Sequence, residues 1–138
     1  MQYREGNWID PKYPMQITST FSDGVYANFE GNEGDVWEYK LKDIEPILMT
    51  EEWHNKFGVL KNGFNNFEYK LPMNNTIVFN GDYVFLRQGN DKPMECDIVT
   101  IWNKDLTKRD MYVHEFQNLY LILAGEELLN QSTRAKNN

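Results

Sequence analysis

Hydrophobic and polar residues alternate in short runs over most of this chain, and turn residues separate the runs. Near the beginning, Gln16–Phe21 and Val25–Phe29 are β-rich segments on either side of Ser22-Asp23-Gly24. Asp-Gly between two such segments is typical of a tight hairpin. A third β-rich run, Val36–Leu41, follows a second turn of glycine and acidic residues. This spacing predicts a small SH3-like β-barrel or a curled antiparallel sheet in residues 1–48.

A short helix and a second group of strands are predicted in the middle of the chain. Thr50 can cap a helix in which Trp53 and Phe57 are four residues apart and therefore share one face. We expect His54 to lie on the exposed side of this helix. Turn pairs such as Asn-Gly separate the β-rich runs that follow, which indicates an antiparallel sheet. These runs are Phe64–Leu71, Thr76–Phe79, Tyr83–Gln88 and Asp97–Trp102.

The segment Tyr112–Leu128 is the one long run with a helical period. One broad apolar face forms at about 100° per residue, and we expect it to pack on the second sheet. The opposite side carries further apolar residues, which do not suit a solvated surface. Either a neighbouring segment of the chain covers that side, or a second subunit or another partner does. The interface candidates on it are His114, Gln117, Asn118, Leu121 and Ile122.

Together these elements predict an α+β fold with two lobes in one compact unit. Residues 1–48 form the β-barrel-like lobe. Residues 49–130 form an α+β lobe, in which the C-terminal helix packs on a further antiparallel sheet. Residues 131–138 are polar, and we expect this tail to fray. A chain of 138 residues can bury a core without help from a metal or a disulfide.

The acidic composition narrows the classes of partner. The formal net charge is −7, with 14 basic residues scattered among 21 acidic ones. Nucleic-acid binding is disfavoured because it needs a basic surface, whereas a protein partner or a homodimer remains compatible with this charge. No signal-peptide-like start and no apolar run of about 18 residues is present. We therefore expect a cytoplasmic protein without a membrane span, and the single cysteine, Cys96, suits a reducing compartment.

Residues that could carry chemistry are few. The two histidines, His54 and His114, belong to no set of three ligands such as zinc requires, so we expect no metal, no cofactor and no catalytic residue. A hydrolase would need the fold to bring His114 or Cys96 beside complementary groups. Trp37 follows an acidic turn and is the candidate for stacking on a base or a sugar. Core packing is the commoner role of such an aromatic residue.

Three motifs add a resemblance to these patterns. They are Gly6-Asn7-Trp8-Ile9, Thr50-Glu51-Glu52-Trp53 and the segment Tyr112–Leu128, which contains His114 followed by Gln117-Asn118. Together they resemble a widespread family of small proteins from Bacteroides-type gut bacteria and their prophages or mobile elements. The resemblance spans nearly the whole chain, although His54 stands where an apolar residue is usual. It implies an accessory protein that binds a host factor, and it brings no established activity.

These observations favour a non-enzymatic accessory protein of the phage or mobile-element type that acts through protein–protein contacts. The over-apolar C-terminal helix and the acidic charge are the main reasons. A small-ligand or nucleotide-binding module with an aromatic pocket is the first alternative. A hydrolase is the second.

Overall fold

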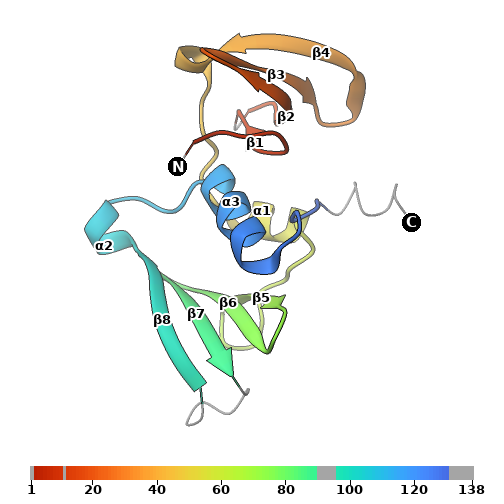
Figure 1. The fold of residues 1–138 in the computed structure, drawn as a ribbon. Coiled ribbons are helices and arrows are strands. Elements are labelled where there is room, and N and C mark those ends of the chain that lie inside the picture. The colour runs from red at the N-terminus through yellow and green to blue at the C-terminus, as the bar shows by residue number, and fades with distance from the viewer. Residues whose placement is uncertain (1, 11, 90–95, 131–138) are drawn as a thin grey trace. The chain divides into compact units, whose positions relative to one another are not determined.

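The computed structural model describes residues 2–10, 12–89 and 96–130 (Figure 1). The tail expected to fray, residues 131–138, lies outside the described residues. The fold is α+β, as predicted, with two four-stranded antiparallel sheets and few helices. The chain divides into two compact units. Unit 1 comprises Met1–Met49 and Tyr112–Glu127, and unit 2 comprises Thr50–Met111 and the residues from Leu128 onward.

The sheet of unit 1 is a meander of four strands in sequence order. Phe21 pairs with Gly24, so the turn predicted around Asp23 joins two strands as a hairpin. No ladder joins the first strand to the fourth within the described part of the chain, so the sheet is open and the SH3-like barrel is not confirmed. The strands are β1 (Trp8–Ile9), β2 (Met15–Phe21), β3 (Gly24–Phe29) and β4 (Asn32–Lys40), followed by a 3-10 turn, η1 (Leu41–Asp43).

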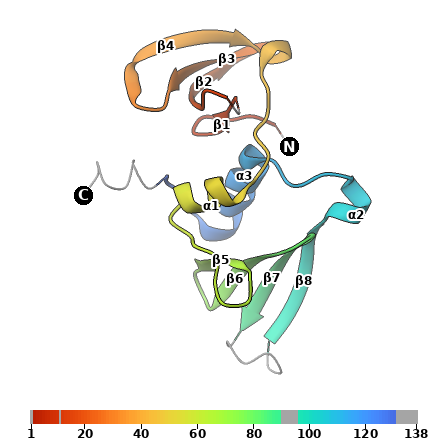
Figure 2. The same cartoon turned by 180° about the vertical axis from the view of Figure 1, so that it is seen from behind.

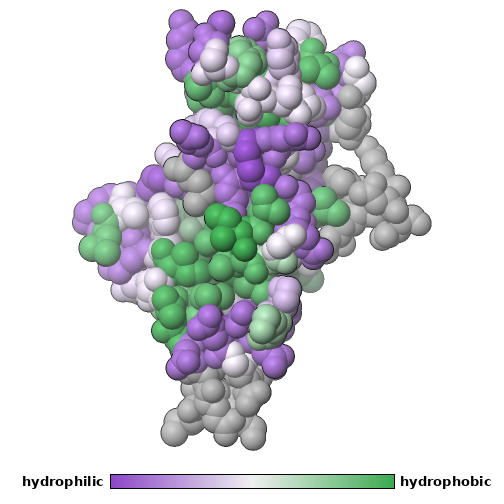
Figure 3. All heavy atoms as spheres, viewed as in Figure 1, coloured by the Kyte–Doolittle hydropathy of each residue, from purple (hydrophilic) through white to green (hydrophobic). Residues whose placement is uncertain are grey.

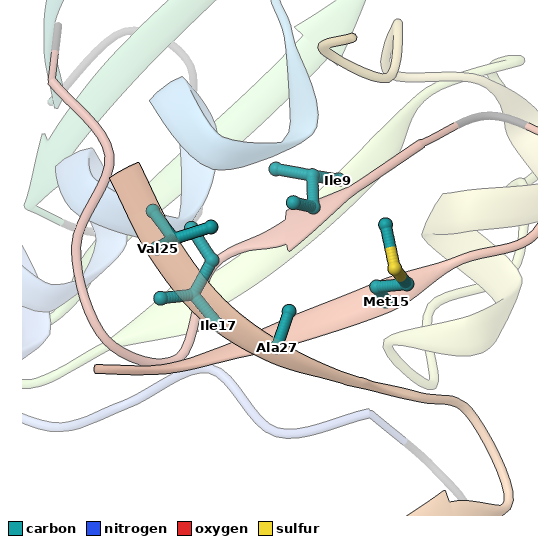
Figure 4. Close-up of a cluster of buried hydrophobic side chains, with 5 residues drawn as sticks. All are labelled: Ile9, Met15, Ile17, Val25 and Ala27. Atoms are coloured by element: carbon teal, nitrogen blue, oxygen red, sulfur yellow. The ribbon is translucent and has the colours of Figure 1, made fainter. Parts of the chain in front are cut away.

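One face of this sheet carries the core of unit 1 (Figure 4). Side chains alternate between the two faces of a strand, so every second residue of β2 and β3 points to the same side. Tyr3, Phe29, Tyr39 and Ile44 pack against the edge of this cluster. Its buried members are Ile9, Met15, Ile17, Val25 and Ala27.

The C-terminal helix, α3 (Val113–Ala124), belongs to unit 1, and this corrects the prediction that it forms one lobe with residues 49–111. The backbone N–H of Val113 donates to the carbonyl of Ile47 at 2.6 Å, and α3 contacts β1. Gly125, with φ of +76°, ends the helix where the pattern predicted. The helical period identified an apolar face, but that face does not specify which of two apolar sheets it meets.

Unit 2 also contains a meander of four strands in sequence order, and the predicted runs correspond to them. The short helix begins after Thr50, as predicted, and Figure 2 shows it beside the β5–β6 end of the sheet. One short helix was not predicted; the Asn103 side chain caps it by accepting from the backbone N–H of Asp105 at 2.9 Å. The elements are α1 (Glu51–Lys56), β5 (Phe67–Leu71), β6 (Asn75–Asn80), β7 (Tyr83–Gly89), β8 (Cys96–Asn103) and α2 (Lys104–Thr107).

Candidate functional site

Gln117 of α3 binds the backbone of the N-terminal segment rather than facing solvent. Its Oε1 accepts from the backbone N–H of Trp8 at 2.8 Å, and its Nε2 donates to the carbonyl of Gly6 at 2.9 Å. The side-chain amide thus provides one acceptor and one donor to the backbone at the start of β1, as the backbone of a neighbouring strand would. Gln117 is fully buried, which makes both hydrogen bonds costly to lose.

Asn118 makes a second pair of hydrogen bonds to the same segment. Its Oδ1 accepts from Nδ2 of Asn7 at 2.9 Å, and its Nδ2 donates to the carbonyl of Gln2 at 2.9 Å. Asn7 is itself fully buried, and its Oδ1 accepts from the backbone N–H of Arg4 at 2.8 Å. Of the two alternatives for this side of α3, cover by another segment of the same chain therefore applies to Gln117 and Asn118, and the covering segment is the N-terminal one.

His114 is also buried in unit 1. Its ring centroid lies 4.4 Å from that of Tyr3 and 5.8 Å from that of Tyr112. Burial raises the pKa of Tyr3 above its ordinary value, and Tyr112 and then Glu115 add to the rise.

Ile122 is the member of the interface set that remains clearly exposed, at 74%. Leu121 is half-buried. A contact surface on α3 would thus have to centre on Ile122, and its role as an interface residue stays a prediction. The angular position of residues around a helix shows which of them share a side. It does not show that the N-terminal segment packs against His114, Gln117 and Asn118.

His54 lies in an aromatic cage in unit 2, and the prediction that it is exposed is wrong. Its ring stacks on Phe67, with centroids 4.0 Å apart and planes 6° apart, and it meets the edge of Phe79 at 4.5 Å. His54 Nδ1 and the Tyr69 hydroxyl are 2.7 Å apart and share a hydrogen bond. Burial lowers the pKa of His54 from 6.5 to about 4, so the imidazole is neutral at physiological pH.

The cage suits packing better than catalysis. A general base must reach the proton that it removes, whereas His54 is 4% exposed and its Nδ1 already shares a hydrogen bond with Tyr69. No group of three or more His, Cys, Asp or Glu side chains that could hold a metal occurs among the described residues. The side chain of Cys96, the other candidate for chemistry, lies outside the described part of the chain.

Trp37, the predicted stacking residue, lies on β4 and is 51% exposed. Its ring meets that of Phe29 edge-on at 6.2 Å. A hollow of about 440 Å³ opens elsewhere in unit 1, beside the β2–β3 turn, and Trp37 does not line it. The residues around this hollow are Gln2, Tyr3, Thr20, Phe21, Ser22, Gly24, Val25 and Leu41.

The outer edge of β8 is the surface that sequence reasoning missed. Within the described residues β8 pairs with β7 alone, so its other side is the end of the β5–β8 sheet. Ile98 is 59% exposed and Val99 is 52% exposed, and hydrophobic side chains gather over the β7–β8 half of this sheet (Figure 3). An exposed apolar edge strand offers unpaired backbone groups to another strand. The sequence contained an indication of this edge, because Asp97–Trp102 has one charged residue and is the last β-rich run of the second group.

The fold therefore defines an α+β protein made of two antiparallel meanders, with an exposed apolar strand at the edge of the second. Comparisons with protein-family models, curated proteins and solved structures give no match to this chain. Among the residues described, no helix has the length and apolarity needed to cross a membrane.

Proposed function

We propose that this protein acts through protein–protein contacts, without catalysis, by accepting an extended segment of a partner at the outer edge of β8. The exposure of Ile98 and Val99 on that edge is the observation that carries the proposal. Addition of a strand to a sheet edge is a recurring mode of peptide recognition, in which backbone hydrogen bonds provide affinity and alternate side chains provide specificity.

Both faces of the sheet beside this edge can receive apolar side chains. Val99 lies opposite Leu86 on one face, and Thr100 lies opposite Phe85 on the other. An added strand would place its alternate residues next to these two pairs, because side chains alternate across the sheet. A partner segment rich in β-branched and aromatic residues therefore fits better than a charged one.

Strand addition is consistent with the accessory role that the family resemblance implies. A small cytoplasmic protein of a phage or mobile element can act by occupying a segment of a host protein, and this needs no active site. The net charge of −7 favours partners that are neutral or basic around the bound segment.

Selection from a displayed library of random peptides tests this proposal across many possible partner sequences at once. Wild type, Ile98→Lys and Val36→Lys serve as targets, after circular dichroism has shown that each is folded. Ile98→Lys adds a charge to the β8 edge, and Val36→Lys is the control, since Val36 is a similarly exposed residue on β4. We expect β-rich peptides that bind wild type and Val36→Lys and bind Ile98→Lys about tenfold more weakly. No enrichment, or equal binding to all three proteins, would contradict strand addition at β8.

A second candidate function rests on the hollow in unit 1. Its volume of about 440 Å³ is that of a small-molecule site, and its lining includes the apolar residues Phe21 and Val25 and the hydroxyl-bearing residues Tyr3 and Thr20. A nucleoside or a sugar would suit this lining. Thermal-shift screening against both classes should raise the melting temperature of wild type and leave Thr20→Trp, which fills the hollow, unchanged. Equal shifts in the two proteins, or none in either, would exclude this site.

A further inference from the structure

We infer that the strand received at β8 is the β8 of a second copy of this chain, so that two four-stranded sheets join into one sheet of eight strands. This inference rests on the proposed strand addition at β8 and names its occupant. Three features of the edge support it: the symmetry of its central residues, the distribution of its charges, and its contrast with the edge strand β4 of unit 1.

The central residues of β8 are self-complementary in an antiparallel pairing. With a two-fold axis at Val99, Val99 of one copy faces Val99 of the other, and Ile98 faces Thr100 on each side of the axis. All three residues are β-branched, and cross-strand pairs of this kind stabilise sheets. Val99 and Ile98 are both more than half exposed in the single chain, so the pairing would cover apolar surface that is otherwise solvated.

The charges at the two ends of β8 also favour this arrangement. Asp97 is the one charged residue of the strand, and the two Asp97 carboxylates would be about 13 Å apart, four residues along the strand direction. That separation exceeds the Debye length of about 8 Å at physiological salt, so their repulsion is largely screened. At the other end, the Arg109 guanidinium carbon lies 5.0 Å from the centroid of the Trp102 ring, whose Nε1 donates to the Arg109 carbonyl at 3.2 Å. Each Asp97 therefore approaches the end of the opposing strand where Arg109 is held.

The β4 edge is a poorer place for such a pairing. Its exposed carboxylates include Asp35 and Glu38, and Lys40 stands at the far end of the strand. Two copies of this strand would bring both pairs of carboxylates into one ladder, and like charges opposite each other destabilise a sheet. The contrast favours β8 over β4 and provides a matched control position, Val36.

A contact limited to one strand edge buries less than the roughly 1,600 Å² of a standard stable interface, so we expect a dimer with a dissociation constant in the micromolar range. Sedimentation equilibrium of wild type over a concentration series measures it. Val99→Lys places two ammonium groups at the axis and should weaken the dimer at least about tenfold. Val36→Lys is the same substitution at similar exposure and should leave the constant unchanged. A wild type that stays monomeric, or a dimer that Val99→Lys does not weaken, would overturn the inference.

Disulfide trapping tests the register independently of affinity. Cys96→Ser removes the single natural cysteine, and Val99→Cys is then added. Directly opposed residues of an antiparallel pair have Cβ atoms about 5 Å apart, close enough for a disulfide after a small adjustment. We expect a covalent dimer on a non-reducing gel for Val99→Cys, and none for Val36→Cys or Ile122→Cys in the same background. A dimer trapped only through Ile122→Cys would place the interface on α3 and refute the β8 pairing.

The two proposals can fail separately. A monomeric wild type that still selects peptides dependent on Ile98 would overturn the second copy and leave strand addition standing. A wild type that neither dimerises nor selects peptides would overturn both. If the second copy occupies the edge, selected peptides should compete with it and shift the sedimenting species toward the monomer.

Discussion

The two units of this protein contain the same kind of sheet and cover it in different ways. In unit 1, side-chain amides of α3 bind the N-terminal segment, and the Gln117–Trp8 hydrogen bond joins residues 109 positions apart. In unit 2, the helix that carries His54 packs on strands that follow it directly, and His54 and Tyr69 are only 15 positions apart. Closing a long loop costs more entropy than closing a short one, but only slightly more for each doubling of length. The chain can therefore combine long-range hydrogen bonds between α3 and the N-terminal segment in unit 1 with a local aromatic cage around His54 in unit 2.

The edges of the two sheets differ as well. The outer strand of unit 1, β4, carries the exposed charged residues Asp35, Glu38 and Lys40, whereas Asp97 is the one charged residue of β8 in unit 2. Charges on an edge strand discourage pairing with other chains. The difference shows that identical topology does not imply identical exposure to partners, and that composition along the last strand decides which edge is available.

The polar clasp of unit 1 consists of the hydrogen bonds that Gln117 and Asn118 make with the N-terminal segment. We expect a single substitution in it to lower the stability of the protein. Gln117→Ala removes the side-chain acceptor of the Trp8 N–H and one of the two donors to the Gly6 carbonyl, which keeps Gln16 Nε2. Leaving a buried donor without its hydrogen bond costs about 1–3 kcal/mol. We expect the free energy of unfolding in urea at neutral pH to fall by about 3 kcal/mol. The control, Asn55→Ala, removes an exposed amide of α1 and should change it by less than about 0.5 kcal/mol. A fall below about 1 kcal/mol for Gln117→Ala would show that the clasp contributes little.

The aromatic cage of unit 2 should make stability depend on pH. The pKa of His54 is lowered from 6.5 to about 4, so the unfolded chain binds a proton there that the folded protein does not. The stabilisation is complete above pH 6.5 and is lost as the pH falls toward 4, by roughly 3 kcal/mol. Urea unfolding at several pH values should show a shallower loss for His54→Phe than for wild type. Parallel curves for the two proteins would contradict a neutral, buried imidazole at this position.

One hairpin turn from each unit, β2–β3 in unit 1 and β6–β7 in unit 2, provides a smaller contrast. A Cβ atom added at Gly24 would meet the backbone oxygen of Tyr39 and the ring of Phe21, so Gly24→Ala must displace the backbone. At Gly81, φ is +55° and no atom lies within 4 Å of the added Cβ, so Gly81→Ala incurs only backbone strain. We expect losses of about 3 and about 1 kcal/mol respectively in thermal unfolding. Equal losses would mean that the close approach at Gly24 relaxes without cost.

Removing a charge from the β4 edge, or adding one to the β8 edge, should change association with little effect on stability. Glu38→Val removes one charge from β4, and Ile98→Lys adds one to β8; both side chains are exposed. Surface changes of this kind alter the free energy of unfolding by about 0.5 kcal/mol or less. Light scattering during concentration should detect earlier aggregation for Glu38→Val and later aggregation for Ile98→Lys. The opposite order would show that edge charge does not control association here.

Local patterns predicted most of the elements because each depends on neighbours in the sequence. The Asp23-Gly24 turn, the helix after Thr50 and the end of α3 at Gly125 all follow from turn and capping preferences. The candidate site was predicted less well. Ile122 is exposed in the single chain, whereas Gln117 and Asn118 bind the N-terminal segment, and β8 was not recognised as the available edge.

The sequence alone determined the α+β class, the run of short strands and the two helices with apolar faces, since periodicity and turn residues act over a few positions. Only the tertiary structure decided which sheet α3 packs against, which polar side chains are buried, and which strand is left at an edge. The physical reason is that apolar faces are interchangeable partners, and a glutamine or histidine suits either water or a buried hydrogen bond. Long-range packing makes that choice, and in this protein it buries three of the candidate interface residues and exposes β8.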